Sequence, residues 1–182
     1  MTRALLIVDI QHDYFPGGRM ELEGSEPASL RAGELLAAFR KRRMPVIHIQ
    51  HISLRPGATF FLPDTDGVKI HDHVAPAAGE TVIQKHFPNS FRDTSLRDQL
   101  EQAGIRELVI AGMMTHMCID ATTRAAADLG YTCFLAHDAC ATRGLSFGAT
   151  KIPADHVHAS FVAALSGSYA TVVPASELVP RG

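Results

Sequence analysis

Three polar side chains stand where buried strands are expected to end. Asp9 and Lys85 each follow a largely apolar run, and Cys118 lies just inside a helix expected after a third run. The carboxyl ends of parallel strands meet at one edge of a sheet, so these side chains are expected to lie together. A thiol, a carboxylate and an ammonium there would supply a nucleophile, a base and a cation. Taken singly, each has a structural interpretation, as a capping carboxylate, a solvated lysine or a core cysteine, but one site accounts for all three.

Strands and helices alternate along the chain that must position these groups. Short apolar runs predict strands at 4–8, 45–50, 81–84, 107–112, 131–136 and 170–173. Apolar residues at helical spacing predict helices at 28–43, 95–103, 117–129 and 154–165. Continuous apolar strands are typical of a sheet covered on both faces, so the pattern predicts an α/β fold with a parallel sheet. The irregular stretches at 12–26 and 53–80 are predicted to be functional loops.

Composition limits the function classes. The 182 residues fit one domain, and 46% are apolar and 20% charged, which argues against disorder. A formal net charge of -2 without a basic stripe argues against nucleic-acid binding. No apolar stretch is long enough for a membrane span, and three cysteines without CxxC spacing favour a reducing, cytoplasmic setting. The last residues, 178–182, match a thrombin-cleavage linker of expression vectors, so the folded domain is expected to cover 1–177.

Three segments of the chain resemble the signature segments of the isochorismatase-like cysteine hydrolases. This superfamily includes nicotinamidases, N-carbamoylsarcosine amidases and isochorismatases. The matching segments, 4–15, 85–91 and 112–118, occur in the family's order, and the resemblance covers nearly the whole chain. It implies a single three-layer αβα sandwich with a six-stranded, mostly parallel sheet. It also implies a homo-oligomer, usually a dimer or a tetramer.

Carried over residue by residue, the resemblance implies a reaction. Cys118 would be the nucleophile, and Asp9 would take the thiol proton and later give it to the leaving amine. Lys85 would hold the carboxylate and help to keep the thiolate available. The family's non-proline cis peptide would here join Met113 to Met114, and the backbone N–H groups of Met114 and Cys118 would form the oxyanion hole. The expected activity is hydrolysis of a small amide, carbamoyl or ureido compound through an acyl-thioester, with no nucleotide or redox cofactor.

Aromatic and polar side chains near the three segments and in the loops are candidates for the substrate pocket. Phenylalanines could wall an apolar pocket around a small planar substrate. Each candidate also has a structural interpretation, as core packing or as a capping group. The candidates are Phe15, Phe60, Phe61, Phe87, Asn89, Phe91 and His116.

The segment after the second strand departs from the metal site of nicotinamidases. His51 falls where the family has an aspartate, and Ser53 falls where it has a histidine. His71 and His73 have no obvious partners, whereas a metal site needs three or four convergent ligands. We therefore expect no metal, and the resemblance does not favour nicotinamide as the substrate.

Two alternatives to the amidohydrolase remain open. Isochorismatases share the fold and cleave a vinyl ether, but the presence of Cys118 favours thiol chemistry. A non-catalytic scaffold that binds a small ligand or senses redox state is the other alternative. Methionines at 113, 114 and 117 leave room for it, because smaller or polar residues are common there in the family. In each case the expected partner is a small molecule.

Overall fold

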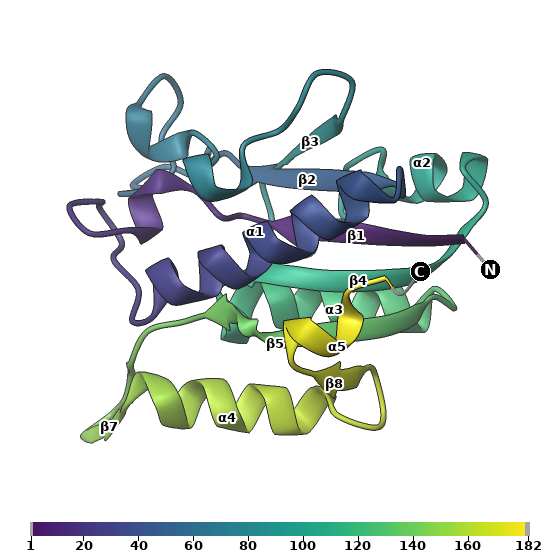
Figure 1. Ribbon diagram of the computed structural model, residues 1–182. Helices are drawn as coiled ribbons and strands as arrows, with labels where there is room; N and C mark the ends of the chain where they lie inside the picture. The colour runs from purple at the N-terminus through teal and green to yellow at the C-terminus, as the bar shows by residue number, and fades with distance from the viewer. Residues whose placement is uncertain (1, 181–182) are drawn as a thin grey trace.

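A six-stranded parallel sheet forms the centre of the molecule. The computed structural model describes residues 2–180 and places the strands in the order β3-β2-β1-β4-β5-β8 (Figure 1). A short antiparallel hairpin, β6–β7, stands apart from this sheet. The strands of the main sheet are β1 (Thr2–Val8), β2 (Val46–His51), β3 (Thr81–Lys85), β4 (Ile105–Met113), β5 (Thr132–Ala141) and β8 (Thr171–Val173). The hairpin is made of β6 (Leu145–Phe147) and β7 (Thr150–Ile152).

The apolar runs form strands because both faces of the sheet are covered. Along β1, Leu5 and Ile7 join one core cluster, and Leu6 and Val8 join the other. Successive side chains of a strand point to opposite faces, so a continuous apolar run satisfies two cores at once. The expected α/β fold with a parallel sheet is confirmed.

Helices cover the two faces unequally. α1 (Ser25–Lys41) and α5 (Ala175–Leu178) contribute side chains to one core cluster. α2 (Leu96–Gln102), α3 (Asp120–Asp128) and α4 (Ala154–Leu165) contribute to the other. In Figure 1, α1 and α5 lie in front of the sheet and α3 lies behind it. The result is the three-layer αβα sandwich that the resemblance implies, and no helix within residues 2–180 is long and apolar enough to cross a membrane.

Several elements differ from the expectation. β5 continues past residue 136 to Ala141, because the chain bulges and then pairs with β4 again. The helix expected at 117–129 begins with a π-helical turn, η4 (Thr115–Ile119), before α3. The predicted functional loops contain three short 3₁₀ turns, and the β6–β7 hairpin was not expected. The 3₁₀ turns are η1 (His12–Tyr14), η2 (Asp66–Val68) and η3 (Asp72–Val74).

The packed chain extends past the expected domain boundary at residue 177. Leu178 ends α5 and is only 4% exposed, within the core cluster on the α1 face. Residue 178 therefore belongs to the packed fold, although the sequence from this residue onward resembles a linker. Residues 181–182 of the expected linker lie outside the described residues.

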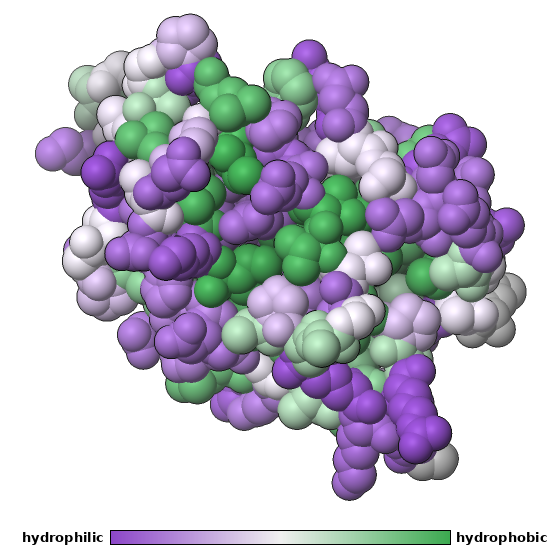
Figure 2. Space-filling view, turned by 90° about the horizontal axis from the view of Figure 1, so that it is seen from above, coloured by the Kyte–Doolittle hydropathy of each residue, from purple (hydrophilic) through white to green (hydrophobic). Residues whose placement is uncertain are grey.

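The edge strand β3 leaves part of its apolar surface exposed. Val82, in the middle of β3, is 42% exposed. Seen from above this edge, apolar atoms form a band between polar side chains (Figure 2). Edge strands of this kind are places where sheets meet other surfaces.

Candidate active site

Asp9 stands directly after β1 in a strained backbone conformation. Its φ is 52°, a left-handed value that is uncommon for residues other than glycine. Its backbone N–H donates to the carbonyl of Ile49 within β2, and its side chain is fully buried. One carboxylate oxygen, Oδ1, is buried without a hydrogen-bond partner among the described residues. A buried carboxylate oxygen without a partner is costly and is typical of a functional group.

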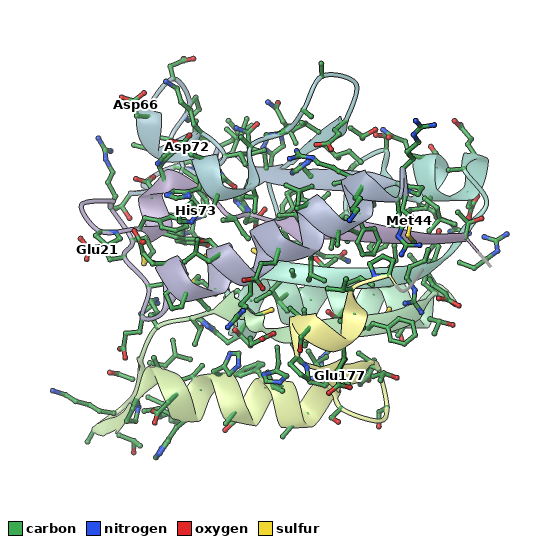
Figure 3. The ribbon with its side chains drawn as sticks, in the orientation of Figure 1. Glu21, Met44, Asp66, Asp72, His73 and Glu177 are labelled. Carbon is green, nitrogen blue, oxygen red and sulfur yellow. The ribbon has the colours of Figure 1, made fainter. Side chains whose placement is uncertain are left out.

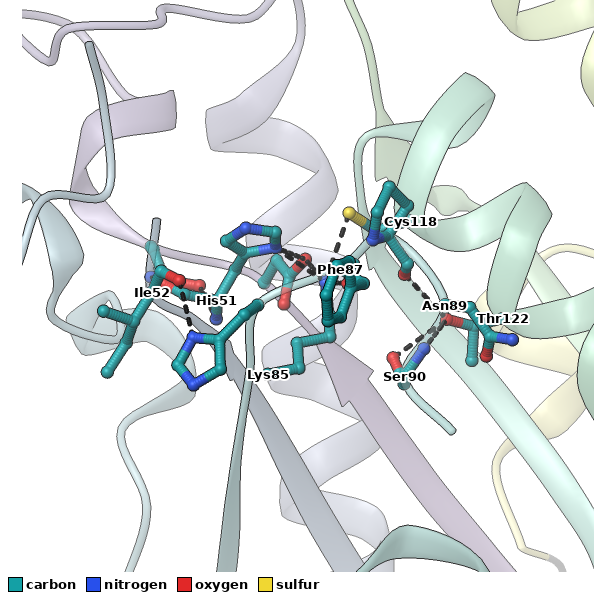
Figure 4. A network of polar contacts seen from close by, with 12 residues as sticks. His51, Ile52, Lys85, Phe87, Asn89, Ser90, Cys118 and Thr122 are labelled. Carbon is teal, nitrogen blue, oxygen red and sulfur yellow. Dashed lines mark hydrogen bonds and ion pairs between the residues drawn. The ribbon is translucent and has the colours of Figure 1, made fainter. Parts of the chain in front are cut away.

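Lys85 ends β3 and brings a buried ammonium group to Asp9. Four acceptors surround Nζ (Figure 4). They are Asp9 Oδ2 at 2.6 Å, His51 Nδ1 at 2.9 Å, the Phe87 carbonyl at 3.1 Å and Cys118 Sγ at 3.3 Å. Burial alone would lower the pKa of Lys85, but the Asp9 carboxylate, with a further contribution from Cys118, outweighs burial and raises that pKa. The lysine is therefore charged.

Cys118 lies in the π-helical turn that follows β4. Its side chain is only 4% exposed. Burial raises the pKa of the thiol, the Asp9 carboxylate raises it further, and Lys85 opposes both. The resting thiol is protonated, so a base must remove its proton before it can attack.

The loop between β4 and Cys118 has the backbone that the resemblance implies. The Met113–Met114 peptide bond is cis, and both side chains are buried. Thr115 ties the loop to its surroundings, because its hydroxyl lies 3.3 Å from the Ala141 carbonyl and 2.9 Å from His158 Nδ1. These contacts position the turn that carries the thiol.

His51 is a member of the site that the sequence analysis did not assign. It pairs in register with Lys85 across β2 and β3, and its ring centroid lies 5.9 Å from that of Phe61. Burial lowers the pKa of His51 to about 4, although Asp9 raises it. The sequence signals were its place at the end of an expected strand and its match to the aspartate position of the nicotinamidase metal site.

A donor set that could hold a metal ion surrounds the lysine. Asp9, His51 and Cys118 each offer one ligand atom, and these atoms lie within 4.8 Å of one another. Among the described residues they are the one group of this kind. Lys85 Nζ contacts all three residues, so a cation already occupies the centre of the donor set. A metal ion bound there would have to displace this ammonium.

The predicted pocket phenylalanines fall into different environments. Phe61 is fully buried and packs on Tyr14 and Phe60, with ring centroids 4.6 and 4.9 Å away. Tyr14 was not assigned a role; burial raises the pKa of its hydroxyl, and the nearby Cys118 and Asp9 add to this effect. This aromatic cluster is the part of the predicted pocket that the structure brings next to His51.

The other phenylalanines have partners of their own. Phe15 stacks on His71 at 3.6 Å between ring centroids. The Arg92 guanidinium lies 3.6 Å above the ring of Phe87. Phe91 stacks on Tyr131 and packs against the core on the α3 face. Phe91 therefore packs in the core, which was the structural interpretation considered for it beside a role in the substrate pocket.

The two polar pocket candidates make local hydrogen bonds. Asn89 Oδ1 accepts a hydrogen bond from the Phe91 N–H, which closes the turn after β3. His116 Nδ1 lies 2.6 Å from the Thr142 hydroxyl, and burial lowers its pKa. Contact of either side chain with a substrate stays a prediction.

Two buried polar side chains hold the loops around the site. The carboxylate of Asp13 accepts from the backbone N–H groups of Arg19 and Phe61. The amide of Gln11 bonds both the N–H and the carbonyl of His51. The stretch 12–26 and the stretch 53–80 are thereby joined to the sheet edge.

His71 and His73, considered above as metal ligands, make contacts with other aromatic rings and with α1. His71 lies between Phe15 and His73. His73 reaches from η3 to α1 (Figure 3), where its Nδ1 lies 2.7 Å from the Ser29 hydroxyl. These contacts connect the long loop to α1.

Comparisons with known proteins agree with this arrangement. The family model of the isochorismatase domain matches residues 3–173. YddQ, an isochorismatase family protein of Bacillus subtilis, is 53% identical over 172 residues, covering 94% of this chain and 96% of YddQ. A streptothricin hydrolase of Streptomyces noursei is 37% identical over 141 residues, covering 78% of this chain and 50% of that protein. A crystal structure from Oleispira antarctica, assigned as an isochorismatase hydrolase, superposes with a TM-score of 0.95 at 52% identity, covering 98% of this chain and 96% of the other. The chain belongs to the isochorismatase family.

Proposed function

We propose that the protein hydrolyses a C–N bond of a small amide, carbamoyl or ureido compound through an acyl-thioester on Cys118. One observation carries the proposal: a single buried ammonium, Lys85 Nζ, contacts both the carboxylate of Asp9 and the sulfur of Cys118. A base and a nucleophile held by one cation are the parts that thiol-dependent acyl transfer needs.

The reaction begins with transfer of the thiol proton. Asp9 Oδ1, which lacks a hydrogen-bond partner, accepts the proton of Cys118, and the thiolate faces Lys85. The thiolate attacks the substrate carbonyl carbon, and the carbonyl oxygen becomes an oxyanion held by the N–H groups of Met114 and Cys118. The C–N bond then breaks, and protonated Asp9 gives its proton to the leaving nitrogen.

Hydrolysis of the acyl-thioester completes the cycle. Water replaces the released amine, Asp9 takes its proton, and the hydroxide attacks the thioester carbonyl. The carboxylic acid leaves, and the sulfur of Cys118 recovers the proton from Asp9. Each step uses one base in alternating protonation states, which a buried carboxylate held by Lys85 supports.

Named relatives support the choice of an amide-type bond. Besides the streptothricin hydrolase, the relatives include nicotinamidase 3 of Arabidopsis thaliana, 24% identical over 151 residues. They also include a ureidoacrylate amidohydrolase of Pseudomonas savastanoi, 26% identical over 177 residues. These three names agree with the proposed C–N hydrolysis. The buried thiol with a raised pKa disfavours a redox sensor, since sensor thiols are accessible and acidic.

The test is intact-protein mass after rapid acid quench, with a panel of small amides, carbamates and ureides. Wild type and Cys118→Ala are compared, and released ammonia is measured in the same samples. A mass gain on wild type alone, or ammonia that needs Cys118, supports the proposal. Turnover of these compounds that survives in Cys118→Ala contradicts it. The absence of both signals with every compound also counts against it and favours the ether-hydrolase alternative, in which the thiol is not the nucleophile.

We also propose a cytoplasmic homo-oligomer that binds a small molecule. All three cysteines are buried and free, which fits a reducing compartment. The exposed apolar surface at the β3 edge supports association. Light scattering during size-exclusion chromatography tests the oligomer, and a monomer at micromolar concentration contradicts it.

A further inference from the structure

His51 makes a contact that fixes which of its ring nitrogens carries the proton. Its Nδ1 lies 2.9 Å from Lys85 Nζ, and Lys85 is charged because it pairs with Asp9 at 2.6 Å. An ammonium has three N–H donors and no acceptor, so Nδ1 must be the acceptor. The imidazole is then neutral, and its one proton is on Nε2.

The Nε2–H group has no acceptor among the described residues. The side chain of His51 is 15% exposed, and the ring of Phe61 beside it offers no acceptor. Backbone contacts from Gln11 hold the residue at both its N–H and its carbonyl. A fixed donor that no protein group satisfies, on a residue touching the catalytic ammonium, is free for a ligand.

We propose that His51 positions Lys85 through Nδ1 and presents Nε2–H to the substrate as a hydrogen-bond donor. The substrate then carries an acceptor, such as a second carbonyl oxygen, besides the carbonyl that is attacked. A substrate with an ammonium or N–H group at that place leaves two donors facing each other and binds less well. This inference names a feature of the substrate and rests on the proposed function.

The Nδ1 contact also affects the thiol. Four acceptors share three N–H donors at Lys85, so His51 competes with Cys118 Sγ for a hydrogen bond. Removing the acceptor at His51 leaves one N–H for each of the other three. The thiolate is then better stabilised, and alkylation of Cys118 becomes faster.

Two substitutions separate the two nitrogen atoms. His51→Asn keeps an acceptor close to the position of Nδ1 and removes the distal N–H. His51→Leu fills similar space but offers neither group, so access to the thiol stays comparable. His156→Asn, on the exposed surface of α4, is the matched histidine control.

The first measurement is the rate at which iodoacetamide alkylates Cys118 at pH 8, followed by peptide mass spectrometry. We expect His51→Leu to react at least about twofold faster than wild type, and His51→Asn and His156→Asn to stay within about twofold. Equal rates in wild type and His51→Leu would overturn the positioning role. This measurement needs no substrate, so its result is independent of the proposed function.

The second measurement is protection of Cys118 from the same reagent by three primary amides of equal length. They end in a carbonyl group, a methyl group or an ammonium group. In wild type the carbonyl-terminated amide should protect about 2- to 12-fold better than the methyl-terminated one, and the ammonium-terminated amide should protect least. Both His51 variants should lose this preference. A preference that persists in the variants, or is absent from wild type, overturns the donor role, whereas lack of turnover with intact protection counts only against the proposed function.

Discussion

At the scale of single residues, one ammonium group organises the candidate site. Lys85 Nζ contacts Asp9 after β1, His51 at the end of β2, the Phe87 carbonyl after β3, and Cys118 after β4. The chain therefore joins four separate segments through one side chain. A buried ion pair is weak evidence of stabilisation, but removing one partner leaves the other charge without compensation.

Replacing Lys85 by Met should destabilise the protein and abolish activity. The Asp9 carboxylate would stay buried without its 2.6 Å partner, which typically costs about 3–5 kcal/mol of unfolding free energy. Urea unfolding followed by circular dichroism measures the loss. Ammonia release from whichever amide the panel identifies measures the activity.

The double variant Asp9→Asn with Lys85→Met separates stability from function. Both charges are then absent, so we expect at least about half of the lost unfolding free energy to return. Activity should not return, because the base is missing. If Lys85→Met and the double variant were equally stable, the loss in Lys85→Met would not come from leaving the Asp9 carboxylate buried and unpaired.

At the scale of elements, a glycine lets two strands meet beside the carboxylate of Asp9. Gly112 in β4 pairs in register with Val8 of β1. Its φ is 138°, and a Cβ atom there would meet the backbone of Val8. The close approach of β4 to β1 fixes the strand end from which Asp9 projects.

Gly112→Ala should therefore cost about 2–5 kcal/mol of unfolding free energy and most of the activity. Gly130→Ala is the matched control, because Gly130 also has a positive φ, 88°, but a Cβ atom there would meet open space. We expect the control to lose about 1–2 kcal/mol and to stay active. Equal losses in the two variants would mean that backbone strain alone, and not the contact with Val8, explains the effect.

The same elements show what the sequence could predict. Asp9, Lys85 and Cys118 could be placed together because parallel strands end at one edge. The contact of His51 with Lys85 could not, since it depends on the register of β2 against β3. The continuation of β5 through Asp138 was missed as well, because polar residues after an apolar run look like the end of a strand.

Loop interactions escaped prediction for a related reason. Asp13 bonds the N–H of Phe61, 48 residues away, at 2.6 Å. A pattern of local spacing carries no information on such a contact, which depends on how the two loops fold over the sheet edge. No periodic pattern of apolar residues marks the three short 3₁₀ turns in these loops, so local sequence patterns could not predict them.

At the scale of the whole molecule, α5 closes the core on the α1 face. Leu178 is 4% exposed there, whereas its neighbour Val179 is 38% exposed. Leu178→Ala should cost about 2–5 kcal/mol of unfolding free energy, the usual effect of emptying a buried leucine site. Val179→Ala should change it by less than about 0.5 kcal/mol. If urea unfolding shows no difference between the two, residue 178 lies outside the cooperative fold, as the linker-like sequence suggests.

Acid should destabilise the whole molecule in a defined window. Burial lowers the pKa of several histidines, and for His51 the lowered pKa is about 4, against 6.5 for an unperturbed histidine. Between these two values the unfolded chain binds more protons than the folded one, so stability falls as the pH falls from 6.5 to about 4. The histidines with lowered pKa are His48, His51, His71, His116 and His158.

The contribution of His51 to this loss can be measured separately. Its shift corresponds to about 3 kcal/mol of unfolding free energy between pH 7 and pH 4. His51→Leu has no group to titrate there, so its urea midpoint should fall less steeply with pH than that of wild type. His156→Asn removes an exposed histidine of α4 and should follow wild type. Parallel pH profiles for wild type and His51→Leu would contradict the neutral His51 in the folded protein, and with it the Nε2–H donor that the proposed substrate preference requires.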